Sequence, residues 1–328
     1  MEIRLLFERD IRALIGPKEA IPAVRDAFAR LARGQAVLPG TIGLDLPEDR
    51  VEVHVKGAHL RGSPAFTIKV AGGSYDNPSR GLPVGHGLVM AFDAKTSFLR
   101  AILFDNGYLT DLRTGAAGAV AADLLARRRV ERVGIVGVGV QARAQLEALL
   151  QVRTPDRVIA FGRDARKAAA YAEEMEARHG ARVLPAKTAE QAVRGSDIVI
   201  TATPAHEPIV RATWVGPGAH VTAVGSDGPE KQELDVGVIG KADKVVADRW
   251  DQCVRLGEIH HAVEAGVFAR ERLHAELGEI CAGLKPGRTS DDEITVADLT
   301  GVGVQDAAVA NVVLEAAARR DLGQTLEI

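Results

Sequence analysis

The sequence contains few aromatic residues and few cysteines. Aromatic side chains make up 4% of the 328 residues, although apolar residues make up 46%, so most of the apolar material is small and aliphatic. Such a composition suits helices packed closely on a sheet and predicts an α/β protein. Cys253 and Cys281 are the only cysteines, and in the absence of an export signal they are expected to be reduced and structural.

Long uncharged hydrophobic runs and an excess of one charge are also absent. No stretch approaches the roughly 18 apolar residues that suggest a membrane span. Charged residues interrupt residues 1–15, which excludes the apolar core of a signal peptide. The 41 basic and 44 acidic residues leave a net charge of -3, so neither nucleic acid nor an anionic membrane is an expected partner. A cytoplasmic location is expected.

The length predicts two domains, because a single hydrophobic core rarely grows beyond about 250–300 residues. In the first part of the chain, strands are expected near 50–56, 66–70, 88–92 and 100–104. In the second part, strands expected over 132–136, 157–161, 197–201, 220–224 and 244–247 alternate with helices, as in parallel βαβ units. We therefore expect an α+β domain over 1–128, completed by the C-terminal helix of 305–328, and a Rossmann domain over 129–304.

A glycine-rich turn opens the second domain. The chain reads Gly137-Val138-Gly139-Val140-Gln141-Ala142 after a buried strand, which matches G-x-G-x-x-A, and a helix follows. Gly137 allows the tight turn, Gly139 leaves room for a pyrophosphate, and Ala142 lets helix and strand pack closely. The phosphates then face the helix N-terminus, which begins with Val140 and Gln141. The motif predicts NAD or NADP as the cofactor, with a ligand-free glycine turn as the alternative.

The end of the next strand bears on the choice between the two cofactors. An acid there binds the ribose 2′-hydroxyl of NAD, whereas an arginine accommodates the 2′-phosphate of NADP. The chain reads Phe161-Gly162-Arg163-Asp164, with glycine at the usual acid position. Arg163 slightly favours NADP, but it is also consistent with a solvated charge at a helix start, and Asp164 could turn toward a ribose. The preference stays open.

Further motifs follow in an order and spacing that resemble those of one family. They are Ile68-Lys69-Val70, Gly81-Leu82-Pro83, Leu109 to Ala117, Gly137 to Ala142, Thr201-Ala202-Thr203, Val224 to Pro229, Glu233-Leu234-Asp235 and Gly301 to Asp306. Over nearly its whole length the chain resembles the ornithine cyclodeaminase and mu-crystallin family, which includes an alanine dehydrogenase and reductases of α-imino acids. The resemblance implies hydride chemistry on a small amino or imino acid, a substrate-binding first domain, and a homodimer joined through that domain.

The resemblance assigns three charged residues to the substrate. Lys69 matches a lysine beside the substrate carboxylate and amino group, Arg113 matches an arginine that clamps the carboxylate, and Asp227 matches the catalytic aspartate. A guanidinium forks onto a carboxylate, and a desolvated lysine can donate a proton. Asp227 follows a Rossmann strand and can exchange a proton with the substrate nitrogen. Without the family, Lys69 reads as an exposed strand lysine and Asp227 as a turn residue.

Three other residues are implied contacts of the coenzyme. Thr114 resembles a pyrophosphate contact, Thr203 resembles a residue of the nicotinamide pocket, and Asp306 resembles a residue close to the nicotinamide. Each is also consistent with an ordinary helix or turn cap. The pair His260-His261 lacks the spacing of a metal motif and is expected on a helix surface, so no metal is predicted.

The first domain departs from the family in two places. Pro39-Gly40-Thr41 stands where the family has an arginine in Pro-x-Arg. In the strand that follows, Glu52, His54 and Lys56 share the polar face, where ornithine-type members have a glutamate for the distal ammonium. If Lys56 rather than Glu52 faces the pocket, the distal end of the substrate is an anion, because two ammonium groups repel. This favours the branch that contains iminosuccinate reductase.

Three functions are consistent with these residues. The favoured one is NAD(P)H-dependent reduction of a small α-imino acid to an L-amino acid, or the reverse dehydrogenation, with iminosuccinate to aspartate as the preferred reaction. The second is an ornithine-type cyclodeaminase that uses tightly held NAD+ without net redox change. The third is a non-catalytic ligand-binding protein like mu-crystallin, against which the intact Lys69, Arg113 and Asp227 argue.

Overall fold

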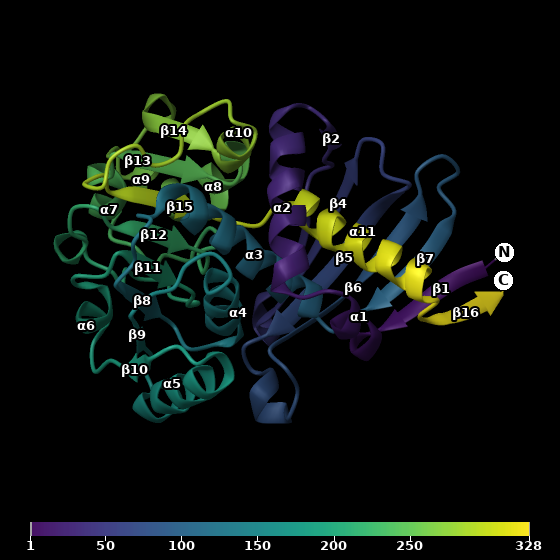
Figure 1. The fold of residues 1–328 in the computed structure, drawn as a ribbon, viewed down its shortest axis with the longest axis horizontal. Helices are drawn as coiled ribbons and strands as arrows, with labels where there is room; N and C mark the ends of the chain where they lie inside the picture. Colours follow the sequence, from purple (N-terminus) through teal and green to yellow (C-terminus); the bar gives the residue numbers. More distant parts are fainter. Residues whose placement is uncertain (1, 328) are drawn as a thin grey trace. The chain divides into compact units, whose positions relative to one another are not determined.

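The computed structural model describes residues 2–327, and its internal contacts divide the chain into two units (Figure 1). The first unit comprises Met1–Arg113 and Val302–Ile328, and the second comprises Thr114–Gly301. The divisions lie at 113/114 and 301/302, whereas the sequence suggested 128/129 and 304/305. The first division lies earlier because helix α3 (Tyr108–Leu125) begins in the first unit and continues into the second.

The first unit contains a mostly antiparallel sheet in the order β16-β1-β7-β6-β5-β4-β2, with β3 also paired to β4. Its strands are β1 (Glu2–Phe7), β2 (Ala36–Val37), β3 (Ile42–Leu46), β4 (Val51–Leu60), β5 (Ala65–Ser74), β6 (Gly85–Asp93), β7 (Leu99–Phe104) and β16 (Gln324–Glu327). Strands β1 and β7 pair in parallel. The alternating segments expected at 50–56 and 66–70 fall in β4 and β5, which lie side by side in the sheet.

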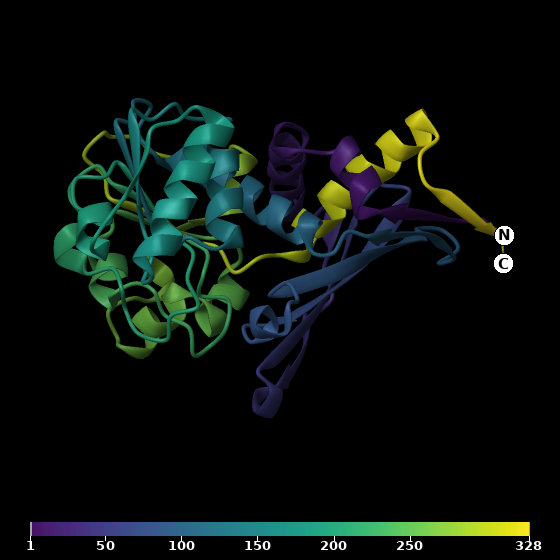
Figure 2. The ribbon, with the colours of Figure 1, turned by 90° about the horizontal axis from the view of Figure 1, so that it is seen from below.

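Three helices pack on this sheet, and Figure 2 shows them on the same side of it. They are α1 (Glu8–Leu14), α2 (Pro17–Ala32) and α11 (Gly303–Arg320), and α11 contacts α2, β4 and β5. Under the helices, the side chains of Ala65, Thr67 and Lys69 are buried, whereas their neighbours along β5 point to the opposite face. Lys69 is therefore placed on the helix-covered side of the sheet by strand parity.

The second unit is a Rossmann fold whose sheet is wholly parallel, in the order β10-β9-β8-β11-β12-β15-β13-β14. Its strands are β8 (Arg132–Val136), β9 (Arg157–Phe161), β10 (Val183–Pro185), β11 (Ile198–Thr201), β12 (His220–Ala223), β13 (Lys244–Ala247), β14 (Leu273–Glu276) and β15 (Thr295–Asp298). The order reverses between β8 and β11, where such folds bind ligands at the carboxyl ends of the strands. The expected fold class is confirmed.

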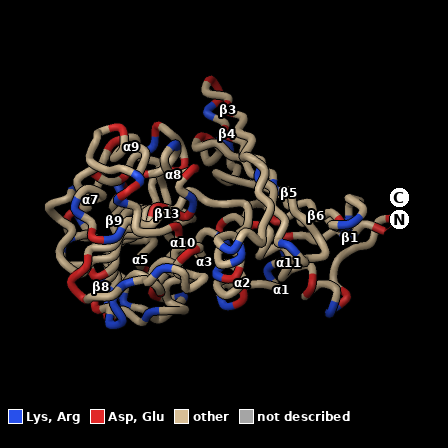
Figure 3. Tube along the Cα trace, turned by 90° about the horizontal axis from the view of Figure 1, so that it is seen from above, with Lys and Arg blue, Asp and Glu red and all other residues tan. Residues whose placement is uncertain are grey.

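Small aliphatic residues fill the core of the second unit, and short helices cover its sheet. The helices after α3 are α4 (Val140–Leu149), α5 (Ala165–His179), α6 (Ala189–Val193), α7 (Val236–Lys241), α8 (Trp250–Leu256), α9 (Glu258–Glu264) and α10 (Leu277–Cys281). Valine, alanine and isoleucine dominate the buried clusters, as the low aromatic content suggested. Basic and acidic residues are interspersed along both units (Figure 3). None of the helices in residues 2–327 is both long and apolar enough to cross a membrane.

Candidate active site

The turn between β8 and α4 forms one wall of a cleft in the second unit. Gly137 has a φ of 111°, and a Cβ there would lie 2.3 Å from the carbonyl oxygen of Ala202, so only glycine fits. At Gly139 no atom lies within 4 Å of the position of a Cβ, which leaves the backbone open to the cleft. The lining residues are Gly137, Val138, Gly139, Phe161, Gly162, Arg163, Asp164, Lys167, Ala202, Thr203, Pro204, Ala205 and Ile209. This geometry fits a dinucleotide, with the pyrophosphate beside Gly139.

Arg143 stabilises the glycine turn from behind. Its Nη1 donates to the carbonyl oxygens of Val138 and Gly139 over 2.7 and 3.1 Å. Its Nη2 donates to Glu174 Oε2 over 2.6 Å, so the guanidinium is itself anchored. The sequence motif does not include this arginine, which lies one turn into α4. It fixes the orientation of both carbonyl groups in the glycine turn.

Four residues expected at the coenzyme lie outside the lining of this cleft, and they are Val140, Gln141, Thr114 and Asp306. Val140 and Gln141 form the first turn of α4, and the side chain of Val140 is 57% exposed. Thr114 lies in α3, and its carbonyl oxygen accepts a hydrogen bond from Gln145 Nε2 over 2.8 Å. Contacts of these residues with the coenzyme stay predictions. Thr203, in contrast, lines the cleft directly.

The position that usually selects NAD is crowded by the side chain of Val138. A Cβ on Gly162 would lie 2.5 Å from Val138 Cγ2, so a larger residue would require local movement. Asp164 caps α5, because its Oδ1 accepts hydrogen bonds from the backbone N–H groups of Arg166 and Lys167 over 2.8 and 3.3 Å. Arg163 and Lys167 also line the cleft and contribute two cationic side chains to it.

A buried group of charges lies in the first unit, formed by Lys69, Arg113 and Asp306. Lys69 Nζ lies 2.9 Å from Asp306 Oδ1, and Arg113 Nε lies 3.2 Å from the same oxygen. Arg113 Nη1 donates to Gln305 Oε1 over 2.7 Å. Gly303 allows the start of α11 to lie close to β4, because a Cβ on Gly303 would lie 2.6 Å from the carbonyl oxygen of Gly57. The N-terminal end of α11 is thus held against the sheet.

The electrostatics of this group favour proton exchange by the lysine. Burial lowers the pKa of Lys69 to about 8, Asp306 opposes that shift, and Arg113 and Lys56 add to it. Burial alone would raise the pKa of Asp306, but Lys69 and Arg113 together hold it below its usual value. The group therefore combines a stable carboxylate with a lysine that can titrate near neutral pH.

The polar face of β4 lies beside this group. Lys56 is paired with Lys69 across the β4–β5 ladder, and His54 is paired with Ala71, so both side chains share the face of Lys69. Glu52 lies on the same face, with its Oε2 4.0 Å from His54 Nε2. The polar face of β4 that the sequence predicted is therefore on the same side of the sheet as Lys69. The roles of Lys56 and His54 in substrate binding stay predictions.

Asp227 lies in the loop after β12, at the carboxyl end of the Rossmann sheet. Its side chain is 48% exposed, and its Oδ1 accepts a 2.9 Å ion-paired hydrogen bond from Lys231 Nζ. The side chain of Lys231 is only 3% exposed. The aspartate is therefore oriented by a buried cation while remaining accessible.

Sequence reasoning missed four polar residues that organise these sites. They are Lys231, Glu233, Gln305 and the buried Asp105, whose Oδ2 accepts the backbone N–H of Leu109 over 2.8 Å. The spacing of Asp227 and Lys231, four residues apart, was an available signal for the ion pair. Glu233 and Gln305 belong to motifs that the family resemblance quoted, but their contacts depend on the tertiary structure.

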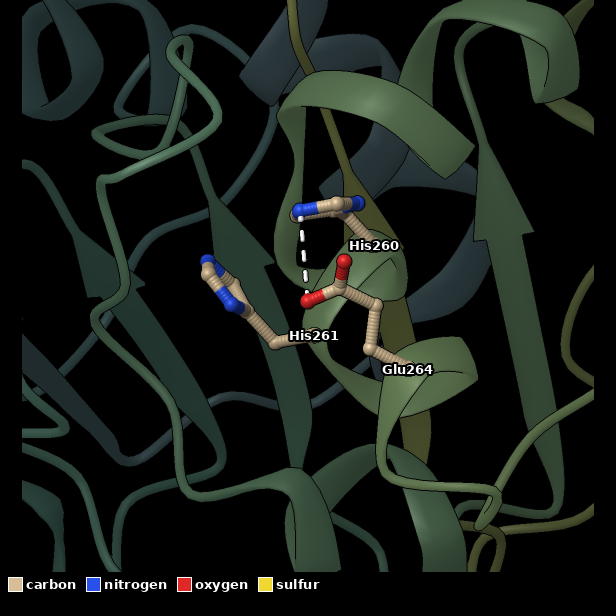
Figure 4. A group of neighbouring side chains, drawn as sticks. All are labelled: His260, His261 and Glu264. Carbon is tan, nitrogen blue, oxygen red and sulfur yellow. Dashed lines mark ion pairs between the residues drawn. The ribbon is translucent and has the colours of Figure 1, made fainter.

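One group of possible metal ligands occurs among residues 2–327, formed by His260, His261 and Glu264 of α9 (Figure 4). His260 Nε2 lies 3.6 Å from Glu264 Oε2, and His260 Nδ1 lies 3.2 Å from the carbonyl oxygen of Val254. His261 Nε2 lies 2.8 Å from the carbonyl oxygen of Lys231. Each ring therefore has a partner within the protein, and the expectation that no metal binds stays a prediction.

The Rossmann unit and its glycine turn define a dinucleotide-dependent oxidoreductase. The chain belongs to the ornithine cyclodeaminase/mu-crystallin family, whose model matches residues 2–321. An uncharacterized cyclodeaminase of Sinorhizobium fredii is 44% identical over 99% of both chains. The alanine dehydrogenase of Archaeoglobus fulgidus is 40% identical over 100% of this chain and 99% of its own. The iminosuccinate reductase of Paracoccus denitrificans is 32% identical over 99% of both.

Two solved structures share the fold along nearly the whole chain. An archaeal alanine dehydrogenase dimer with bound NAD has a TM-score of 0.93 and 39% identity, with 100% of both chains covered. The Δ1-pyrroline-2-carboxylate reductase of Thermococcus litoralis, in complex with NADH and L-proline, has a TM-score of 0.94 and 33% identity, with 98% and 99% covered. The predictions of the family, of an enzyme and of a nicotinamide cofactor are confirmed.

Proposed function

We propose that the protein reduces a small α-imino acid to the corresponding L-amino acid with NADH or NADPH, or catalyses the reverse dehydrogenation. The observation that carries the proposal is the buried group of Lys69, Arg113 and Asp306, in which a lysine with a pKa of about 8 lies beside an arginine. An α-imino acid needs one cation for its carboxylate and one proton donor for its nitrogen. These two side chains supply both.

Each charged residue has a distinct task in this proposal. Arg113 binds the substrate carboxylate through its guanidinium, which fixes the orientation of the α-carbon. Lys69 donates a proton on the nitrogen side of the substrate, and Asp306 maintains its orientation. Asp227 exchanges a proton with the amino group, and Lys231 keeps its carboxylate in position. When bound, the nicotinamide supplies the hydride.

The preferred substrate is a four-carbon dicarboxylate, iminosuccinate, which gives aspartate. Lys56 is paired with Lys69 on the same face of the sheet, and no arginine stands at Thr41. A second ammonium group near the substrate site attracts a distal carboxylate and repels a distal ammonium. The iminosuccinate reductase among the relatives is consistent with this choice.

A cyclodeaminase acting on an ornithine-like diamine is the second candidate. Glu52 lies on the same face of β4 as Lys56, and a carboxylate attracts a distal ammonium group. A relative at 44% identity carries the name of an uncharacterized cyclodeaminase. Lys56 argues against this candidate, because it would lie on the same face as the incoming cation.

We also propose that two copies join through the first unit. The face of its sheet opposite the three helices carries stacked phenylalanines, with Phe66 and Phe92 at 5.1 Å and Phe7 and Phe104 at 5.6 Å between ring centroids. Phe7 is 42% exposed although it belongs to this apolar row. Multi-angle light scattering should give twice the chain mass of 34.8 kDa. The mass of a single chain at micromolar concentration would contradict the dimer.

Coenzyme oxidation tests the proposed reaction. The protein is mixed with NADH or NADPH, ammonia or methylamine, and a panel of 2-oxo acids, and loss of the reduced-nicotinamide absorbance is followed. Oxaloacetate with ammonia, which forms iminosuccinate in solution, should react faster than pyruvate with ammonia. Release of ammonia from ornithine with NAD+ and no net coenzyme reduction would instead identify a cyclodeaminase. A location in the cytoplasm stays a prediction.

A further inference from the structure

Glu233 has a fully buried side chain whose carboxylate is approached by four donors of the second unit. Its Oε1 accepts hydrogen bonds from the backbone N–H and the Oγ1 of Thr203, over 2.6 and 2.8 Å. Its Oε2 accepts from Thr201 Oγ1 over 2.7 Å and from the backbone N–H of Gly225 over 2.9 Å. One side chain therefore joins the end of β11 and the loops that follow β11 and β12.

The donor pattern requires an oxygen acceptor at both positions of this side-chain group. The backbone N–H groups of Thr203 and Gly225 can only donate, and they point at different oxygens of Glu233. An amide in its place would turn its NH2 toward one of them, and that N–H would lose its acceptor. Burial raises the pKa of Glu233 to about 7, and the hydrogen bonds from Thr201 and Thr203 act in the opposite direction.

The two loops joined by Glu233 carry residues expected to contact different ligands. Thr203 is expected at the coenzyme, and Asp227 is expected at the substrate nitrogen. Thr203 lines the coenzyme cleft. Gly225 leads through Ser226 to Asp227. A Cβ on Gly225 would lie 2.3 Å from the carbonyl oxygen of Thr203 and 2.6 Å from the Glu233 carboxyl carbon, so the loops are in close contact. A small shift of the carboxylate would therefore move both loops.

A second buried acid holds the backbone of this segment. Glu258, at the start of α9, accepts hydrogen bonds from the backbone N–H groups of Glu233 and Leu234 over 2.8 and 3.0 Å. Its side chain is 1% exposed. Glu233 is thus fixed at its main chain by Glu258 and at its carboxylate by the two loops. Such a doubly held side chain has little freedom to adopt another rotamer.

We propose that Glu233 is a positioning residue, which sets the separation of Thr203 from the Asp227 loop and thereby shapes the coenzyme site at its Thr203 end. It touches no reacting atom and acts through the residues that its carboxylate binds. The part that concerns Asp227 rests on the proposed function, whereas the part that concerns coenzyme affinity does not. A direct binding measurement therefore separates the two.

The test is the affinity of Glu233→Gln for NADH, measured by fluorescence titration of the full-length protein. We expect the dissociation constant to rise about tenfold or more, the effect of losing one charge-assisted hydrogen bond and leaving one N–H without an acceptor. The Michaelis constant for the coenzyme should rise in parallel in any reaction found. Wild-type affinity for NADH in the variant would overturn the proposal.

Asp298→Asn is the matched control. Asp298 is 1% exposed, and burial raises its pKa to about 7, as for Glu233. Its Oδ2 accepts the backbone N–H of Ile259, and within residues 2–327 its carboxylate forms no hydrogen bond with Thr203 or Gly225. Asp298→Asn should therefore lower the melting temperature about as much as Glu233→Gln does. It should change the affinity for NADH less than about threefold, because Asp298 does not position the loop that carries Thr203. Equal weakening in both variants would show a general structural effect and overturn the proposal.

Thr201→Val keeps the test decisive if Glu233→Gln does not fold. Thr201 is fully buried in β11, lies outside the cleft lining and reaches the site through Glu233 Oε2. The nearly isosteric change removes one of the four donors, so NADH should bind severalfold more weakly, about 2- to 5-fold. Unchanged affinity in this variant would count against the proposal. If affinity falls in these variants but no imino acid is reduced, the proposed function fails and the role of Glu233 stands.

Discussion

Lys69 and Asp306 form a buried ion pair, with Nζ and Oδ1 2.9 Å apart and each side chain 3% exposed. Lys69 belongs to β5 and Asp306 to the first turn of α11, so the two residues come from the two separate chain segments that form the first unit. A buried pair of this kind contributes little net stability, because desolvation offsets the attraction of the charges. The pair instead influences the charge and protonation of Lys69, because Asp306 raises the pKa that burial lowers.

The rate of imine reduction should fall as the pH rises through about 8. Lys69 can donate a proton only while it is charged, and burial lowers its pKa to about 8, so the charged form predominates below that pH and disappears above it. The measurement is kcat/KM against pH. In Lys69→Arg the cation cannot lose its proton, so the remaining activity should lack this alkaline decline. An identical decline in that variant would assign the titration to another group.

Arg113→Lys should lower kcat/KM for the substrate by about 1.5–3 kcal/mol, because a lysine cannot fork onto a carboxylate. The affinity for NADH should change much less, because the proposed partner of Arg113 is the substrate carboxylate and Arg113 does not line the coenzyme cleft. Steady-state kinetics and fluorescence titration measure the two quantities separately. A parallel loss of both would show that Arg113 supports the structure rather than the substrate.

Lys56→Ala should cost about 1.5–3 kcal/mol in kcat/KM toward a four-carbon dicarboxylic substrate, the range for hydrogen bonds to charged groups. Activity toward an alanine-sized analogue should barely change, since that substrate has no distal carboxylate for Lys56 to bind. The comparison of the two substrates is the measurement. An equal loss on both, or a wild-type preference for ornithine, would remove the dicarboxylate hypothesis while leaving the family assignment intact.

Arg163→Ala should weaken NADPH more than NADH, because a charge-assisted contact with the 2′-phosphate is lost. Lys167→Ala is the control, since Lys167 is another cation that lines the cleft. Titration of each variant with both coenzymes gives the ratio of affinities. An equal effect of Arg163→Ala on NADH and NADPH would identify Arg163 as a surface charge.

Gly139→Trp should abolish coenzyme binding and leave the fold largely intact. The position of a Cβ on Gly139 has no neighbouring atom within 4 Å, so a side chain can be accommodated, but it would fill the space expected for the pyrophosphate. Gly137→Ala is the contrasting variant, because its Cβ would lie 2.3 Å from the Ala202 oxygen and would strain the turn. Circular dichroism and NADH titration distinguish the two outcomes. Unchanged coenzyme affinity of Gly139→Trp would refute the pyrophosphate assignment.

Local pattern determined much of the fold and part of the site. The turn from Gly137 to Ala142 follows a buried strand and opens a helix, and each of those features depends on neighbouring residues only. The alternation in residues 50–56 likewise placed Glu52, His54 and Lys56 on one face, because side chains along a strand alternate by geometry. The family resemblance then added Lys69, Arg113 and Asp227, which no local rule distinguishes from surface charges.

Only the tertiary structure decided which charges meet. The sequence suggested Asp306 as a coenzyme contact or a helix cap, whereas the fold places its carboxylate between Lys69 and Arg113. It also brings the carboxylate of Glu233 to the backbone of Thr203, which lies thirty residues earlier in the chain. Such contacts depend on how strands and helices distant in sequence pack together, and burial then sets the pKa of each group. Sequence periodicity describes one helix or strand at a time. It therefore contains no information about contacts between distant side chains, or about the pKa shifts that those contacts cause.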